Sequence, residues 1–130
     1  MDNLYAFLHP VATEETKEVI ISERFKNEDG SIQPFVIKAL TQAENERIYR
    51  KCRDKKGNTD ALEYSKRLIV AATVTPAFDN PEICEAFGTL DPTEVPGKML
   101  FAGEYAALQN AIMEFSGFEN NAAEEAAKNL

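Results

Sequence analysis

The sequence predicts an α+β fold, in which an N-terminal β-hairpin packs on a small bundle of about four helices. Three observations lead to this expectation. Two apolar runs flank an Asp29-Gly30 turn signal, the segment Thr41-Gln42-Ala43-Glu44 has the form of a helix-capping box, and later apolar residues recur mostly at helical spacing. A chain of 130 residues has the size of one domain, and we expect residues 1–118 to form a single compact domain.

The hairpin is expected within the segment VIISERFKNEDGSIQPFVIKAL. The glycine of the Asp29-Gly30 turn tolerates the positive φ that tight turns require. A loop of these two residues would place Phe25 opposite Pro34. A loop that also includes Ser31 places Phe25 opposite Phe35, and we expect this register because pairing follows the apolar pattern. Since proline cannot donate a ladder hydrogen bond, the second strand is predicted to be an edge strand or to carry a bulge at Pro34.

Two helices are expected after the hairpin. The capping box opens the first, from about Gln42 to Arg53, which ends at the polar turn 54–58. The second runs from about Asp60 to Thr73. Residues 68–74 are largely apolar and β-branched, so a buried helix and a strand both stay open there, and length favours the helix. The side chains expected to face the core are Ala43, Ile48, Tyr49 and Cys52 in the first helix and Ala61, Leu62, Tyr64, Leu68, Ile69, Ala71 and Ala72 in the second.

Two further helices complete the predicted bundle. Asn80-Pro81 has the form of an N-cap followed by proline at the first helical position, which predicts a short helix to about Phe87. A loop with proline and glycine is expected over residues 89–98. The last helix follows this loop. Its predicted core face consists of Tyr105, Leu108, Ile112 and Phe115.

The end of the last helix is also readable from the sequence. Gly117 fits the left-handed position of a Schellman motif, and Phe118 can then pack on Met113. Residues 119–130 are rich in Ala, Asn and Glu and offer no aliphatic or aromatic side chain before Leu130. We therefore expect them to form a frayed or disordered acidic tail.

Charge and hydropathy argue against two classes of partner. The net charge is −8 at pH 7, with a local basic cluster in the two middle helices and their connecting turn. Because nucleic-acid binding usually needs a basic domain or a basic face interleaved with aromatic residues, we expect no nucleic-acid partner. No apolar run approaches the roughly 18 residues of a membrane span, and no basic segment precedes the short LYAFL run, so we expect neither membrane insertion nor secretion. Cys52 and Cys84 are expected to be reduced, small hydrophobic residues.

No pattern in the sequence predicts a catalytic, cofactor-binding or metal site, and we expect a protein that is not an enzyme. His9 is the single histidine, so a metal site would have to consist almost wholly of carboxylates. The serines lack the Gly-flanked turn of a nucleophile elbow. Pro96-Gly97-Lys98 resembles the end of a phosphate-binding loop, but the upstream glycine is missing and Met99 occupies the Ser/Thr position.

Two groups of residues are candidates for binding a partner protein. One group ends the loop that precedes the last helix, because loops that combine rigid turn residues with apolar side chains often carry contacts. An equally weighted alternative is that these residues begin the packing of the last helix. The other group belongs to the basic cluster, for which a solvated helix face is the commoner explanation. The candidates are Met99, Leu100 and Phe101 in the loop and Arg47, Arg50 and Lys51 on the helix.

Two segments of the chain resemble one known family. The segment VIISERFKNEDGSIQPFVIKALTQAENERIYRKC is similar to the N-terminal region of the XkdN-like tail assembly chaperones of long-tailed phages (siphoviruses) and prophages of Gram-positive bacteria. The segment PGKMLFAGEYAALQNAIMEFSGF resembles the closing motif of that family. The similarity covers most of residues 4–118, and its weight comes from the order and spacing of the motifs together.

The resemblance implies a non-enzymatic role in virion morphogenesis, without a cofactor. Such chaperones bind the long helical tape measure protein in the host cytoplasm and keep it soluble while tail tube subunits assemble. The implied partners are the tape measure protein, the tail tube protein and a longer form of the chain itself made by ribosomal frameshifting. A homo-oligomer stays open. The alternative is a small structural virion protein, such as a head–tail connector or a tail completion factor, which would share the size and acidity of this chain.

Overall fold

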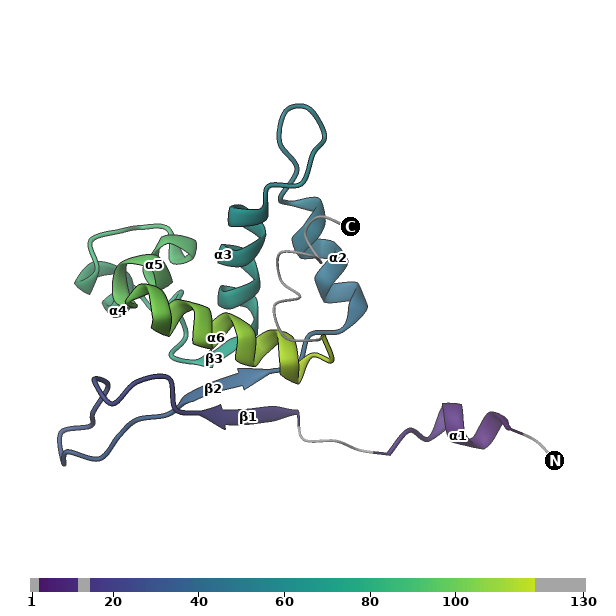
Figure 1. Cartoon of the computed structure of the whole chain (residues 1–130), viewed down its shortest axis with the longest axis horizontal. Helices are drawn as coiled ribbons and strands as arrows, with labels where there is room; N and C mark the ends of the chain where they lie inside the picture. The colour runs from purple at the N-terminus through teal and green to yellow at the C-terminus, as the bar shows by residue number, and fades with distance from the viewer. Residues whose placement is uncertain (1–2, 12–14, 119–130) are drawn as a thin grey trace.

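The computed structural model describes residues 3–11 and 15–118 and contains a three-stranded antiparallel sheet (Figure 1). The strands are β1 (Thr16–Val19), β2 (Phe35–Lys38) and β3 (Thr73–Thr75), in the order β1-β2-β3. Helices α2 to α6 lie on one side of this sheet. The helical elements are α1 (Leu4–Leu8), α2 (Gln42–Arg50), α3 (Ala61–Ala72), α4 (Pro81–Ala86), the 3-10 turn η1 (Pro92–Glu94), α5 (Val95–Met99) and α6 (Ala102–Phe115). The prediction of an α+β fold is confirmed. The disorder expected for residues 119–130 lies outside the described residues.

The hairpin loop has the predicted length but lies one residue earlier than predicted. The amide of Asn27 donates to the carbonyl of Ser31 at 2.8 Å, and the amide of Gly30 donates to the carbonyl of Asn27 at 2.9 Å. The loop is therefore residues 28–30, with Gly30 at φ 87°. The side chain of Asp29 accepts from the amide of Ser31 at 2.9 Å, an Asx-type bond that stabilises the turn.

The predicted register of the two strands is wrong. Val19, and not Phe25, pairs with Phe35 in the β1–β2 ladder. Residues 20–24 leave the ladder between the paired strands and the loop. The two phenylalanine rings nevertheless meet, with centroids 5.3 Å apart in a T-shaped arrangement. Phe25 thus reaches Phe35 from outside the ladder, and Phe35 is buried in the core.

The strand that contains Ile37 is central, so the edge-strand alternative is wrong, and the irregularity in its pairing lies between Val36 and Ile37 rather than at Pro34. β2 begins directly after Pro34, where the missing amide proton costs no ladder hydrogen bond. β2 then pairs on its other side with β3, with an irregularity between Val36 and Ile37. Residues 68–74, for which a helix and a strand both stayed open, contain one of each: α3 continues to Ala72 and β3 starts at Thr73.

The middle helices begin as predicted and bury a narrower face than predicted. In α2 the hydroxyl of Thr41 accepts from the amide of Glu44 at 3.2 Å, and the Glu44 carboxylate accepts from the amide of Thr41 at 3.0 Å, so the capping box is confirmed. The predicted core positions that are buried are Ile48, Cys52, Tyr64, Leu68, Ile69 and Ala72. The buried face of each helix is therefore narrower than predicted. The predicted core residues that are not buried are Ala43, Ala61, Leu62 and Ala71, which are exposed, and Tyr49, which is half-buried. α2 also ends earlier than predicted, at Arg50.

The C-terminal elements confirm two predicted helix boundaries and correct one loop. α4 starts with Asn80 as N-cap, whose side chain accepts from the amide of Glu82 at 2.8 Å. Residues 89–98, predicted as loop, contain η1 and most of α5. α6 ends in the predicted Schellman motif, in which the amide of Phe118 donates to the carbonyl of Met113 at 2.9 Å and Gly117 has φ 95°.

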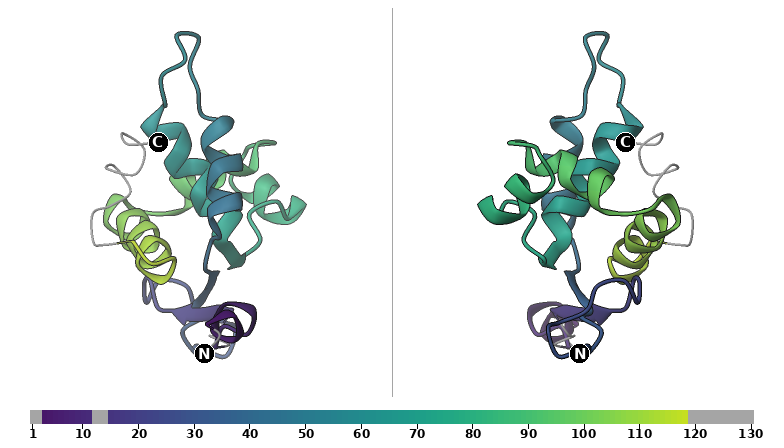
Figure 2. Two further views of the ribbon diagram at one scale, coloured as in Figure 1. Left: turned by 90° about the vertical axis from the view of Figure 1, so that its right-hand side faces the viewer. Right: turned by 90° about the vertical axis from the view of Figure 1, so that its left-hand side faces the viewer.

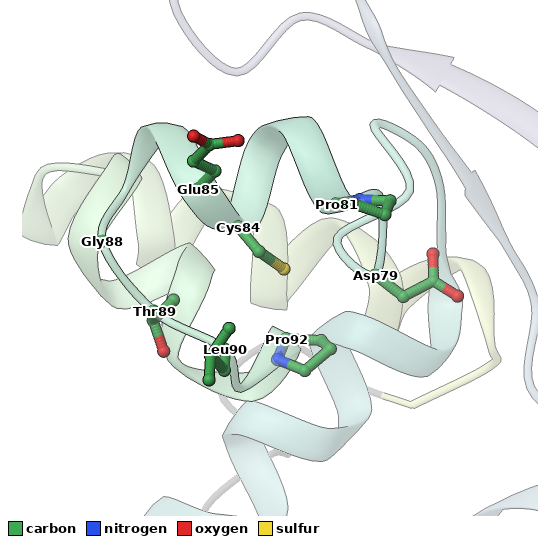
Figure 3. A pocket seen from close by; sticks show the side chains of 8 residues that line it. All are labelled: Asp79, Pro81, Cys84, Glu85, Gly88, Thr89, Leu90 and Pro92. Atoms are coloured by element: carbon green, nitrogen blue, oxygen red, sulfur yellow. The ribbon is translucent and has the colours of Figure 1, made fainter.

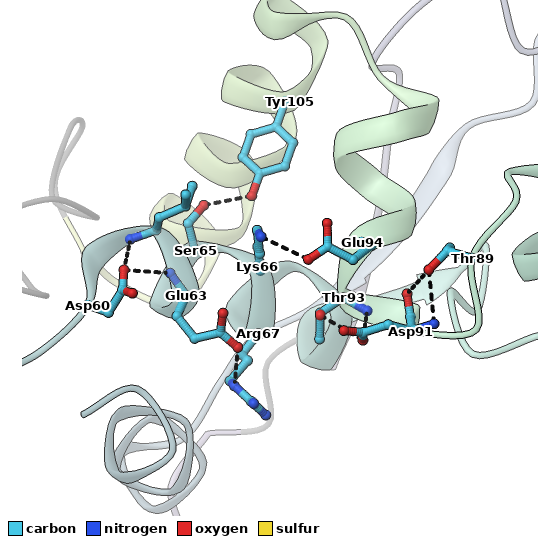
Figure 4. Close-up of polar contacts among 11 residues, drawn as sticks. Asp60, Glu63, Ser65, Lys66, Arg67, Thr89, Asp91, Thr93, Glu94 and Tyr105 are labelled. Carbon is cyan, nitrogen blue, oxygen red and sulfur yellow. Dashed lines mark hydrogen bonds and ion pairs between the residues drawn. The ribbon is translucent and has the colours of Figure 1, made fainter. Parts of the chain in front are cut away.

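Helix α3 links the other elements of the bundle by polar bonds as well as apolar packing (Figure 4). Its N-cap Asp60 accepts from the amides of Leu62 and Glu63. The hydroxyl of Ser65 meets that of Tyr105 on α6 at 2.9 Å. Lys66 forms an ion pair of 2.9 Å with Glu94 at the end of η1. These bonds connect α3 to α6 and to η1.

Candidate interaction surfaces

The exposed apolar side chains of the described residues are concentrated near the N-terminus. Ten large hydrophobic side chains are exposed in the part of the chain that the structure describes, and five of them lie between residues 4 and 11. We call residues 3–11 the N-terminal arm. Its helix α1 contains no buried residue, and Tyr5 and Phe7 are 72% and 81% exposed. Figure 1 shows α1 projecting from the body at the end of the sheet opposite to α4. An apolar segment of this kind is typical of a contact surface.

The loop residues predicted to bind a partner divide into buried and exposed positions. Leu100 is buried in the core, as expected for the alternative in which these residues begin the packing of the last helix. Met99 is half-buried against the same core. Phe101 is 66% exposed, and its ring lies 4.1 Å from the guanidinium carbon of Arg24. Of this group, Phe101 alone offers a mostly open apolar side chain to a partner.

Arg24 ties the segment after β1 to the start of α6. Its guanidinium donates to the two carboxylate oxygens of Glu104 at 2.6 and 3.0 Å and to the carbonyl of Met99 at 3.1 Å. The Glu104 carboxylate also accepts from the amide of Phe101 at 2.7 Å. The hydrogen bond from Arg24 lowers the pKa of Glu104 to about 2. This bidentate pair joins residues that lie 80 positions apart in the chain, and no local pattern in the sequence predicts it.

Two of the predicted basic residues line a small hollow between α2, α3 and η1. We call it the basic hollow. It has a volume of about 210 Å³, and Arg47, Lys51 and Arg67 contribute the positive charges. Arg67 is held at 2.9 Å from Glu63 by an ion pair, whereas Arg47 and Lys51 are exposed. Ile48, Val70, Ala71 and Thr93 complete the lining. Arg50 is exposed and lies outside this lining, so the structure brings together two of the three helix candidates.

A larger groove, which no sequence pattern predicts, lies beside α4. It has a volume of about 610 Å³, and we call it the α4 groove (Figure 3). Cys84 from α4 faces Leu90 and Pro92 of the following segment, and Asp79 and Glu85 lie at the border. Pro81, Gly88 and Thr89 complete the lining. Leu90 is fully exposed, so this groove presents an apolar side chain that no other part of the described chain covers.

The charged loop between α2 and α3 forms a separate projection. Arg53 and Thr59 pair in an isolated bridge, and Gly57 takes φ 82° at the tip, as expected for the predicted turn. Figure 2 shows this loop extending beyond both helices. It carries Lys55 and Lys56, which are exposed. The basic cluster of the sequence is therefore divided between this projection and the helix α2.

The two cysteines are free, and both are buried, as expected for small hydrophobic residues. Burial raises the pKa of the Cys52 thiol to about 11, so the thiolate is not available near neutral pH. The thiols of Cys52 and Cys84 lie within hydrogen-bond distance of the carbonyls of Ile48 and Phe78. Within residues 3–11 and 15–118, no group of three His, Cys, Asp or Glu side chains is arranged to hold a metal ion.

Comparison with known proteins identifies the family. The family model described as "Phage XkdN-like tail assembly chaperone protein, TAC" matches residues 4–128. The chain belongs to this family. It is 32% identical to the "Phage-like element PBSX protein XkdN" of Bacillus subtilis (strain 168), over 98% of this chain and 97% of the relative. It is also 35% identical to the "Uncharacterized protein YqbN" of the same organism, over 95% of this chain and 92% of the relative.

The fold agrees with that of a solved structure of similar sequence. The crystal structure of the protein yqbn superposes with a TM-score of 0.75 at 33% sequence identity, covering 88% of this chain and 96% of that chain. The resemblance inferred from the hairpin and the last helix is thus confirmed. The XkdN-like chaperones are a non-enzymatic family, so the expectation that the chain is not an enzyme is confirmed as well. In the part of the chain that the structure describes, no helix is long and apolar enough to cross a membrane.

Proposed function

We propose that this member of the tail assembly chaperone family binds the tape measure protein in the host cytoplasm and keeps it soluble during tail assembly. The observation that carries the proposal is the family match, which extends over residues 4–128. The tail tube protein is proposed as a further partner. A longer, frameshifted form of the chain is proposed too, because Ala127-Lys128-Asn129 can be encoded as GCA-AAA-AAC, which contains a slippery A-AAA-AAC run. Coding DNA without such a run near these codons would contradict this last proposal.

The physical properties of the surface support a role in holding amphipathic helices. A helix that places its apolar face in a groove needs an apolar floor and charged residues at the border. The basic hollow has this composition, with Ile48 and Val70 beside Arg47 and Lys51. We propose that it binds a helix whose apolar face is flanked by carboxylates. Phe101 and Arg50 remain proposed as further contacts.

Many weak contacts suit this role better than one tight site. The basic hollow is small, and a long helical partner offers many similar segments. Several copies of the chaperone can then occupy one partner chain with high combined occupancy although each contact is weak. The net charge of −8 opposes aggregation of such an assembly.

The proposal is tested by co-expression with the tape measure protein encoded in the same phage or prophage. We expect the tape measure protein to become more soluble and to co-purify with several copies of the chaperone. A double substitution, Arg47→Glu with Lys51→Glu, should reduce both effects. Lys55→Glu with Lys56→Glu is the matched control, because it changes charge equally on the projecting loop.

Two results would count against the proposal. If the wild-type protein neither co-purifies with the tape measure protein nor changes its solubility, binding of that partner is wrong. If the protein is instead found in purified particles at fixed stoichiometry, the alternative of a structural virion protein is favoured. If the two double variants bind and solubilise the tape measure protein equally well, the basic hollow is not its binding site.

A further inference from the structure

Two apolar surfaces are exposed in the part of the chain that the structure describes, and they lie toward opposite ends of the sheet (Figure 1). One is the N-terminal arm, and the other is the α4 groove with its fully exposed Leu90. Together they account for six of the ten exposed large hydrophobic side chains in residues 3–11 and 15–118. Apolar surface of this kind is expected to be buried in a contact.

We infer that the N-terminal arm of one copy docks into the α4 groove of a second copy. Leu4, Phe7 and Leu8 lie at positions i, i+3 and i+4, so they share one face of α1. This spacing is the pattern by which a helix places anchor side chains in an apolar groove. In the second copy, Cys84 and Pro92 would lie beneath the arm, and the exposed side chain of Leu90 would pack against it from the edge of the groove.

Charge and size favour the arm as the occupant of this groove. Asp79 and Glu85 at the border repel an acidic segment, and the chain as a whole is acidic. Residues 3–11 contain no Asp, Glu, Lys or Arg, so they approach this border without repulsion. A volume of about 610 Å³ is within the range that receives several large side chains.

The geometry favours contact between copies over contact within one copy. α1 projects at one end of the sheet and α4 lies toward the other end, so the arm of a given chain points away from its own groove (Figure 1). Arm and groove are different surfaces, so the contact is heterologous, and each added copy leaves one arm and one groove free. Repetition of this contact produces an open chain of copies unless the rotation between them closes a ring.

The expected association is weak, because one short helix in one groove buries less surface than the roughly 1,200 Å² of a stable complex. Analytical ultracentrifugation of the full-length protein should show mass increasing with concentration, up to about 1 mM. Phe7→Asp in the arm and Leu90→Asp in the groove should each weaken association by at least about tenfold. Leu62→Asp is the matched control, since Leu62 is exposed on α3 and belongs to neither surface, and it should leave association unchanged.

Mixing the variants provides the decisive measurement. Phe7→Asp keeps an intact groove and Leu90→Asp keeps an intact arm, so an equimolar mixture should form a one-to-one dimer that grows no further. Circular dichroism of each variant checks that it is folded. A wild-type protein that stays monomeric at about 1 mM, or a mixture that stays monomeric, would overturn the inference. Leu62→Asp weakening association as strongly as the other two would also overturn it.

Discussion

The buried hydrogen bond between Tyr64 and Asn45 is predicted to stabilise the contact between α2 and α3. The hydroxyl of Tyr64 on α3 donates to the side-chain carbonyl of Asn45 on α2. Tyr64 is 1% exposed and Asn45 is 4% exposed, so water cannot replace either partner. Burial raises the pKa of Tyr64 to about 12, which keeps the hydroxyl neutral and able to donate.

Tyr64→Phe removes the donor and leaves the Asn45 carbonyl buried without this partner. An unsatisfied buried acceptor costs about 1–3 kcal/mol, so the free energy of unfolding should fall by about that amount. For a chain of 130 residues this corresponds to a fall in Tm of roughly 4–12 °C. Urea unfolding followed by circular dichroism measures the change. Tyr5→Phe, on the exposed arm, is the control and should change stability by less than about 0.5 kcal/mol.

A double-mutant cycle separates the hydrogen bond from the packing of the ring. Asn45→Leu combined with Tyr64→Phe removes both polar partners, so the double variant should be less destabilised than the sum of the single variants. A coupling free energy of about 0.5–3 kcal/mol is expected for residues in direct contact. Strict additivity, or a Tyr64→Phe variant as stable as wild type, would refute the argument that this bond stabilises the contact.

Three other predictions follow from the core, the capping box and the C-terminus. Phe35→Ala should lower the free energy of unfolding by about 3–5 kcal/mol in urea titrations, because Phe35 is buried, and an unchanged stability would contradict that packing. The hydrogen bond from Lys38 lowers the pKa of Glu44 to about 2. The ionised Glu44 carboxylate should therefore stabilise the fold fully above about pH 4.5, and this stabilisation should be lost as the pH falls toward 2. Lys38→Met should flatten this dependence in a measurement of Tm against pH. Deletion of 119–130 should cost under about 1 kcal/mol, and a larger loss would show that this segment packs on the domain.

Elements that depend on neighbouring residues could be predicted from the sequence. The capping box at Thr41 and the Schellman end at Gly117 are each encoded within a few consecutive residues, and both are present as predicted. The N-cap at Asn80 is another example. In each case the hydrogen-bonding groups lie within one helical turn, so spacing along the chain determines geometry.

The strand register could not be predicted, because contacts distant in sequence determine it. The expectation that Phe25 pairs with Phe35 was based on apolar matching alone. Arg24 instead bonds to Glu104 and to the carbonyl of Met99, and the residues next to it lie outside the ladder. A bond across 80 residues has no signature in local periodicity.

Of the candidate surfaces, the basic hollow could be predicted in part and the α4 groove could not. The basic hollow needs α2, α3 and η1 to be placed side by side, so the sequence predicted Arg47 and Lys51 without their surroundings. The α4 groove was not predicted, because its lining combines residues of α4 with residues of the segment that follows it. The spacing of Leu4, Phe7 and Leu8 was visible in the sequence and is the signal that could have identified the arm.

Phe101 contacts Arg24 within the fold and is also largely exposed to solvent. The two alternatives for residues 99–101 were a partner-binding loop and the start of the packing of the last helix. Leu100 and Met99 follow the second alternative, since both contact the core. The ring of Phe101 contacts the Arg24 guanidinium, and its amide donates to Glu104, so the backbone here is fixed before any partner arrives. An exposed aromatic ring held in this way loses little conformational entropy on binding, which is the property expected of an anchor residue.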